Sequence, residues 1–247
     1  MDRLVYTAMT GAKHILEQQA TTAHNVANAT TTGFRAQLDS FRAVPVIGGV
    51  LPTRAFVVDA TVGSDFTIGS LQTTGRDLDV AVEGKGWLVV QKNDGSEGFT
   101  RNGSFKVSEN GALQTLSGLN IVGEGGPITI PPEVTITIGK DGTISTVPNS
   151  GNPNPVQIIG RLKLVNPAET NLIRGDDGLF KTKDGQPVDA DPVVTVVSGT
   201  LEGSNVSPVD GLVTMINLAR QFELQMKLLT DAESNEAKAS QILNLNG

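Results

Sequence analysis

The sequence predicts a mixed, mainly β protein with a long α-helix at each end, and the two helices are expected to pair as a coiled-coil-like assembly domain. Residues 1–29 contain one glycine and no proline, and residues 207–245 contain one glycine and a single proline at the front. Both ends therefore favour helix. The middle holds most of the 28 glycines and eleven of the 12 prolines. Glycines and prolines between β-branched runs are typical of antiparallel strands joined by turns.

The N-terminal helix is predicted from apolar residues that recur at alternating steps of three and four. Two polar residues, Gln19 and Thr22, continue the same spacing, which is that of a narrow coiled-coil seam. We expect the helix to end in the threonine-rich stretch before Gly33, with that glycine as its left-handed C-cap. The apolar residues of this seam are Val5, Ala8, Ala12, Ile15 and Val26.

The C-terminal helix is predicted to begin at a clear signal. Ser207 fits the N-cap, Pro208 the first helical position and Asp210 the acid of a capping box. Gly211 lies in the first turn, where alanine is expected to be neutral or stabilising. At 1.5 Å per residue the helix would be about 57 Å long, so we expect it to pack on the other helix and on further copies. Its apolar stripe comprises Leu212, Ile216, Ala219, Phe222, Met226 and Leu229.

The middle of the chain is predicted to be a series of hairpins, because Asx-Gly pairs separate its β-branched runs. These pairs are at 94–95, 110–111, 141–142, 177–178 and 184–185. The runs predict strands at 87–91, 105–108, 134–138, 158–165 and 193–198. The domain organisation expected from this pattern is a helical assembly domain from 1–32 and 205–247, an extended linker or β segment at 33–75, and a β-rich outer domain at 76–204.

Charge and composition exclude several classes of function. The net charge of −7 and the single tryptophan and tyrosine argue against binding of nucleic acid. The chain has no cysteine and its two histidines are ten residues apart on one helix, so no metal site is expected. No nucleophile elbow or phosphate-binding loop occurs, and we expect no catalytic residue, cofactor or small-molecule substrate. A β-rich carbohydrate-binding module and a soluble hydrolase remain as alternatives to a structural protein.

Four blocks of sequence resemble the signatures of bacterial flagellar rod and hook proteins. They lie at both ends and in the centre of the chain, in the order that the family has them. His24 and Val26 replace the commoner Asn and Leu of the first signature without disturbing a helix followed by a turn. The matching residues are Asn25, Ala27, Asn28, Thr32, Gly33, Phe34 and Arg35 in the first block, Arg76, Leu78, Asp79, Gly84 and Gly86 in the second, Thr100, Arg101 and Gly103 in the third, and Glu202, Gly203, Ser204, Asn205 and Val206 in the fourth.

Within this family, residues 1–9, 41–46 and 51–54 resemble a proximal rod protein, with a distal rod protein as the alternative. The resemblance implies a structural subunit of the rod that transmits motor torque to the hook. It also implies self-association in a helical assembly, with other proximal and distal rod proteins and the rod-capping protein as partners. The N-terminus lacks an apolar signal-peptide core. The resemblance accordingly implies export by the flagellar type III apparatus to a periplasmic rod without a cleaved signal peptide.

Overall fold

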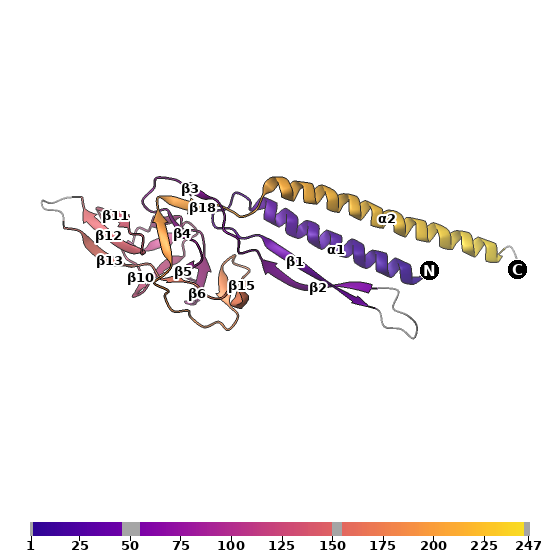
Figure 1. The fold of residues 1–247 in the computed structure, drawn as a ribbon, viewed down its shortest axis with the longest axis horizontal. Helices are drawn as coiled ribbons and strands as arrows, with labels where there is room; N and C mark the ends of the chain where they lie inside the picture. Colours follow the sequence, from indigo (N-terminus) through magenta and orange to yellow (C-terminus); the bar gives the residue numbers. More distant parts are fainter. Residues whose placement is uncertain (1, 46–54, 150–154, 245–247) are drawn as a thin grey trace. The chain divides into compact units, whose positions relative to one another are not determined.

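A computed structural model of the chain describes residues 2–45, 55–149 and 155–244 (Figure 1). It has one long helix at each end, α1 (Asp2–Ala27) and α2 (Pro208–Asn244), around a middle made mainly of strands. The predicted fold class is therefore confirmed. Residues 51–54, which carry part of the resemblance to a proximal rod protein, lie outside the described residues.

The chain forms two compact units. Unit 1 consists of residues 1–28, 37–65 and 206–247, and unit 2 consists of residues 29–36 and 66–205. Unit 1 contains both helices and an antiparallel hairpin of β1 (Gln37–Pro45) and β2 (Ala55–Ser64). Unit 2 contains the remaining strands.

In unit 1, α1 packs against the hairpin and also against α2 (Figure 1). Thr21 Oγ1 donates a hydrogen bond to Asp39 Oδ1 at 3.0 Å. The ring of Phe41 meets the ring of His14 edge-on, with 5.4 Å between their centroids. The register of the hairpin shifts between Ser40 and Phe41. Such an irregularity bends a strand and increases its local twist.

The two helices run antiparallel, because Gly11 faces Gln225 in the middle of α2, whereas Val26, at the end of α1, faces Gly211 at the start of α2. The buried and half-buried positions of α2 follow alternating steps of four and three residues, as in a coiled coil. We call these positions the inner seam. It consists of Gly211, Met215, Leu218, Phe222, Gln225, Leu229 and Ala232.

The start of α2 agrees with its sequence signal, whereas the expectation for Gly211 is wrong. Ser207 caps the helix, since the backbone N–H of Asp210 donates to its Oγ at 3.4 Å. A Cβ at Gly211 would lie closer than 3.0 Å to Cγ2 of Val26. Alanine would therefore collide with α1, and the glycine permits the close approach of the two helices.

The C-cap expected at Gly33 is also wrong. The helix ends at Ala27, where the backbone N–H of Asn28 donates to the carbonyl of His24 at 3.2 Å. Gly33 does have the expected positive φ, of 68°, but it lies in a later turn that belongs to unit 2. There a Cβ would collide with the backbone of Arg101 and Asn102. Glycine at this position allows the backbone to pass close to residues 101–102, which are distant in sequence.

Unit 2 is built from antiparallel strands. Its largest sheet has the order β15-β16-β6-β5-β9-β8-β7, with β10 added to β9 and β14 to β5. A three-stranded sheet, β11-β12-β13, and the pairs β17-β4 and β18-β3 complete the unit. The bounds are β3 Leu71–Thr73, β4 Val80–Glu83, β5 Trp87–Gln91, β6 Glu97–Thr100, β7 Phe105–Val107, β8 Leu113–Thr115, β9 Asn120–Gly123, β10 Gly126–Pro127, β11 Val134–Ile138, β12 Thr143–Pro148, β13 Gln157–Arg161, β14 Leu164–Val165, β15 Leu172–Arg174, β16 Phe180–Thr182, β17 Thr195–Ser198 and β18 Thr200–Glu202, with one short 3-10 helix at Glu169–Asn171.

Most sequence expectations for unit 2 are confirmed. All five Asx-Gly glycines have positive φ, between 64° and 83°. The strands at 87–91 and 134–138 have the predicted bounds, and those at 105–108 and 193–198 are shorter than predicted. The run 158–165 is two strands, β13 and β14, because Leu162 leaves the strand to bridge Gly123 and its N–H donates to Gly142.

The apolar core of unit 2 has two parts. The larger part collects inward residues of β4, β5, β7 to β9, β11, β12 and β17, and includes Val90 and Phe105, both fully buried. The smaller part surrounds Trp87 and Phe180, whose ring centroids are 4.7 Å apart. Trp87 is the only tryptophan of the chain.

Candidate functional site

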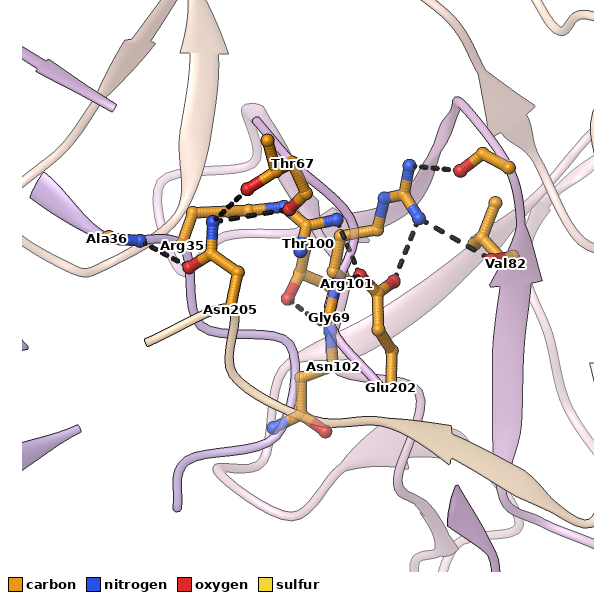
Figure 2. A network of polar contacts seen from close by, with 11 residues as sticks. Arg35, Ala36, Thr67, Gly69, Val82, Thr100, Arg101, Asn102, Glu202 and Asn205 are labelled. Atoms are coloured by element: carbon orange, nitrogen blue, oxygen red, sulfur yellow. Dashed lines mark hydrogen bonds and ion pairs between the residues drawn. The ribbon is translucent and has the colours of Figure 1, made fainter. Parts of the chain in front are cut away.

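Glu202, at the end of β18, is the centre of a buried network in unit 2 that joins the sequence blocks (Figure 2). Its Oε1 lies 2.6 Å from Nη2 of Arg35, and its Oε2 lies 2.8 Å from Nη1 of Arg101. The N–H of Gly69 donates to Oε1 at 3.0 Å. The backbone carbonyl of Glu202 accepts the N–H of Gly33 at 2.7 Å. One residue of the fourth block thus binds residues of the first and third blocks.

Arg101 connects the same network to the second block. Its Nη2 donates to the carbonyl of Gly84 at 2.7 Å, and its Nη1 lies 3.5 Å from the carbonyl of Val82 (Figure 2). Its guanidinium carbon lies 5.4 Å from the ring centroid of Trp87, a cation–π distance. Because β4 supplies Val82 and ends beside Gly84, this arginine fixes the end of β4 to β18.

Asn205 holds the segment that follows Arg35. Its Oδ1 accepts the N–H of Ala36 at 2.8 Å, and its Nδ2 donates to the carbonyl and to Oγ1 of Thr67, both at 3.2 Å (Figure 2). Its own N–H donates to the carbonyl of Phe34 at 3.4 Å. The side chain of Asn205 therefore ties residues 36 and 67 together, and its backbone N–H adds residue 34.

A third arginine, outside the sequence blocks, supports this segment. Arg174 Nη1 donates to the carbonyl of Arg35 at 3.1 Å, and its guanidinium lies over the ring of Phe34 at 4.5 Å. Burial lowers the pKa of Arg174. No sequence motif marks this residue, and neither Gly69 nor Thr67 has a signal beyond the common glycine and threonine of loops.

Asp79 and Gly103 join the second block to the third. Asp79 is buried, and its carboxylate accepts hydrogen bonds from the hydroxyls of Thr74 at 2.8 Å and Ser104 at 3.2 Å. The carbonyl of Gly103 accepts the N–H of Val80 at 3.0 Å. A Cβ at Gly103 would collide with the carbonyl of Val80, so only glycine allows this contact. Arg76 donates to the carbonyl of Phe105, the first residue of β7.

Other residues of the second and third blocks shape the backbone of unit 2. Gly84 and Gly86 both have positive φ, and a Cβ at Gly86 would collide with Val194. Leu78 packs on the larger core. Thr100 Oγ1 accepts the N–H of Asn102 at 3.0 Å.

Within the first and fourth blocks, Gly203 donates its N–H to the carbonyl of Ser70 at 2.8 Å. Thr32, Ser204 and Val206 are half-buried. Val206 is the first residue of the segment that returns the chain to unit 1.

Three residues of the first block instead lie in unit 1. Asn25 forms two hydrogen bonds with the backbone of Gln37, donating from Nδ2 to its carbonyl at 2.9 Å and accepting its N–H on Oδ1 at 2.8 Å. Asn28 Nδ2 donates to the carbonyl of His24 at 2.9 Å at the end of α1. Ala27 is exposed. Asn25 thus fixes the start of β1 on α1 within unit 1.

The electrostatics of the network are unbalanced. Arg35, Arg101 and Glu202 are all buried, so two cations share one carboxylate. Burial lowers the pKa of Arg101; Glu202 opposes this effect and the neighbouring Arg35 adds to it. Beyond its ion pair, the guanidinium of Arg35 forms no hydrogen bond with any described residue. Breaking such a pair by removing one partner leaves buried charge without compensation.

The predicted helix residues fall on two different sides of unit 1. Ala12 and Ile15 are buried, and Val5, Ala8, Val26, Phe222 and Leu229 are half-buried. Leu212, Ile216, Ala219 and Met226 are exposed. The sequence pattern missed five positions of the inner seam, because α2 is apolar on more than one side and both patterns have the same spacing. Those five are Gly211, Met215, Leu218, Gln225 and Ala232.

Among residues 2–45, 55–149 and 155–244, no cluster of acidic or histidine side chains could hold a metal ion. None of the helices that the structure describes is long and apolar enough to cross a membrane. One cavity of about 390 Å³ lies beside β6 and β16, lined by Lys92, Glu97 and Lys181 among others. The network around Glu202 binds distant parts of the chain to one another, and its central residues, Arg35, Arg101 and Glu202, all belong to the sequence blocks.

Comparison with known proteins places these blocks in one family. Residues 5–35 match the model of the flagella basal body rod protein, residues 81–146 that of the flagellar hook protein FlgE/F/G D1 domain, and residues 197–242 that of the flagellar basal body rod FlgEFG protein C-terminal. These ranges include most residues of the network.

Curated relatives extend the match to the whole chain. The flagellar basal-body rod protein FlgF of Salmonella typhimurium is 50% identical over 99% of this chain and all of that protein. The FlgF protein of Escherichia coli is 49% identical over the same shares. A FlgG protein of Buchnera aphidicola is 34% identical over 72% of this chain and 69% of that protein. The chain therefore belongs to the FlgF family of flagellar basal-body rod proteins, which are structural proteins and not enzymes.

Proposed function

We propose that this chain, a structural subunit of the flagellar rod, assembles with its neighbours through the outward faces of α1 and α2. The residues that carry this proposal are large apolar side chains left exposed on the paired helices. On α2 they include Ile216 and Met226, which are 54% and 44% exposed. A helix that is apolar on more than one side is normally covered on more than one side.

The outward face of α1 has the regular spacing of a second seam. Its exposed positions follow steps of three and four residues and are mostly apolar. Tyr6, Met9 and Leu16 are each about half exposed. These positions differ from the buried and half-buried positions of α1, so a neighbouring helix can pack on them while α1 and α2 stay together. The outward positions of α1 are Tyr6, Met9, Lys13, Leu16, Ala20, His24 and Ala27.

In this proposal the predicted interface residues have two roles. Val5, Ala8, Ala12, Ile15, Val26, Phe222 and Leu229 hold the helices together within one subunit. Leu212, Ile216, Ala219 and Met226 contact neighbouring subunits. Contacts between unlike faces that do not close into a ring generate a helical assembly.

The partners in the proposal are other rod subunits, proximal and distal, together with the rod-capping protein. The position is the proximal part of a periplasmic rod, since the FlgF relatives match more of the chain than the FlgG relative does. The proposal includes export through the flagellar type III apparatus, the route that the resemblance to flagellar rod proteins implies.

Ile216→Asp tests the outward face, with Asn217→Asp as the matched control. Both residues are exposed neighbours on α2, and both changes add one negative charge. Ile216→Asp should abolish swarming and rod completion in a deletion strain, because every subunit contact would bury the carboxylate. Since Ile216 is exposed in the subunit, Ile216→Asp should change the unfolding free energy of the purified chain by less than about 0.5 kcal/mol.

Leu218→Ala provides the contrast on the inner seam. Leu218 is buried, so its truncation should lower the unfolding free energy of the purified chain by about 2–5 kcal/mol. A motile Ile216→Asp strain would refute the outward face as an interface. An Ile216→Asp chain that unfolds as readily as Leu218→Ala would show instead that this face packs within the subunit.

A further inference from the structure

The charge network of unit 2 depends on one anion. Glu202 is fully buried and binds both Arg35 and Arg101, and the side chains of the two arginines are at most 4% exposed. A carboxylate that neutralises two buried cations has a larger effect than either cation, because its loss leaves two like charges in an apolar environment. Loss of Arg101 leaves one balanced pair.

The network joins parts of the chain that are far apart in sequence. Arg101 and Glu202 are separated by 101 residues, and Ala36 and Asn205, which bind beside them, by 169 residues. Closing such long loops has an entropic cost that must be offset by contacts already formed. The attraction between exposed charges in water is weak and cannot drive this closure early in folding.

The surroundings that make the network strong come from the folded sheet. Arg101 requires the carbonyls of Val82 and Gly84, at the end of β4, and lies over Trp87 at the start of β5. β4 and β5 contribute fully buried residues to the core. The carboxylate therefore becomes desolvated and well paired only after these strands have packed.

We infer that the ion pairs of Glu202 form late in folding, so that they set the unfolding rate of unit 2 and not its folding rate. Interactions that form after the folding transition state slow unfolding and leave the folding rate unchanged. Unit 2 would unfold readily until residues 200–205 have packed, and would unfold slowly afterwards. This inference concerns unit 2 alone and stands whether or not the outward faces of the helices form rod contacts.

The chain contains its own probe for this test. Trp87 is the only tryptophan, is buried in unit 2 and lies beside Arg101. Its fluorescence in stopped-flow unfolding and refolding of the full-length chain therefore reports unit 2. Denaturant dependence of the two rates separates folding from unfolding.

Glu202→Gln is the central variant, because it removes the charge with almost no change of shape. We expect its unfolding rate to rise at least about 100-fold and its refolding rate to stay within about threefold of the parent. Arg101→Met should raise the unfolding rate by about tenfold or less, since Arg35 and Glu202 still balance. Val90→Ala, in the core of β5, should slow refolding and serves as the control for early contacts.

Three results would overturn the inference. Slower refolding of Glu202→Gln with an unchanged unfolding rate would place the network early in folding. Unchanged rates for Glu202→Gln would mean that the residue acts through its shape alone. A larger effect of Arg101→Met than of Glu202→Gln would assign the role to the arginine contacts. If Glu202→Gln does not fold, Glu202→Asp, which keeps the charge but shortens its reach, should show the same selective rise in unfolding rate.

Discussion

Replacing Gly211 by alanine tests how closely α1 and α2 approach. On an exposed helix the change stabilises by about 1 kcal/mol, because glycine is a poor helix former. In this protein the new Cβ would lie closer than 3.0 Å to Cγ2 of Val26. Overpacking of this kind typically costs about 1–3 kcal/mol. The collision exceeds the gain in helix propensity, and we expect a net loss of about 1 kcal/mol.

Gly11→Ala is the matched control. Gly11 lies on the facing helix, and its Cβ would be 3.5 Å from the side chain of Gln225, an ordinary contact. This variant should be stabilised by up to about 1 kcal/mol. Chemical unfolding followed by circular dichroism at the helix band measures both changes.

A double-mutant cycle isolates the collision. Val26→Ala removes the methyl group that Gly211→Ala would meet, so in that background the alanine at 211 should stabilise. The coupling energy between the two positions should be about 1–3 kcal/mol. Gly211→Ala that stabilises the parent and the Val26→Ala chain equally would refute the proposed close approach.

Three further outcomes follow from unit 2 and from the hairpin of unit 1. Gly103→Ala should lower the unfolding free energy by more than about 3 kcal/mol, because its Cβ would displace the carbonyl of Val80; the urea midpoint of Trp87 fluorescence measures this. Hydrogen bonds from Thr143 hold the pKa of Asp141 below its ordinary value of 3.8. The stability that the Asp141 carboxylate contributes is therefore present above pH 3.8 and is lost as the pH falls through the lower pKa of the folded state. The Asp141→Asn chain should accordingly lose less stability than the parent between about pH 5 and pH 2. Asn25→Ala should cost about 1–3 kcal/mol and expose the amide of residue 37 to hydrogen exchange, because two hydrogen bonds to that backbone are lost.

Local chemistry explains which parts of the fold are predictable from sequence. The Asx-Gly turns could be located because glycine is the residue that readily takes positive φ in a tight hairpin. The start of α2 was equally clear, since a serine cap and a following proline have few other uses together. Both signals depend on neighbours within four residues.

The errors arise where a distant part of the chain determines a residue's role. Gly33 has the positive φ expected of a helix cap, but the reason is the backbone of residues 101–102. The stripe predicted for α2 lies one position away from the inner seam along most of the helix, because a helix with apolar residues on several sides does not indicate which side faces its partner. Gly211 identifies the side of α2 that faces α1, because a Cβ at this position would collide with Cγ2 of Val26. The sequence alone does not reveal this contact.

The candidate site was predictable in its members but not in its connections. Arg35, Arg101 and Glu202 were all identified by the sequence blocks. Nothing local indicates that one carboxylate binds both arginines, or that Arg174 supports the same segment. Pairing across more than 100 residues depends on strand order, which periodicity does not reveal.

The way the chain is divided between the two units has a mechanical consequence. The backbone passes from one unit to the other four times, at 28–29, 36–37, 65–66 and 205–206. Domains in a chain are commonly joined by a single flexible linker, which carries all of any pulling or twisting force. Here a force between the units is shared by four backbone connections. A single protease cut in any one of them leaves three intact, so the units of a nicked subunit would remain attached under load.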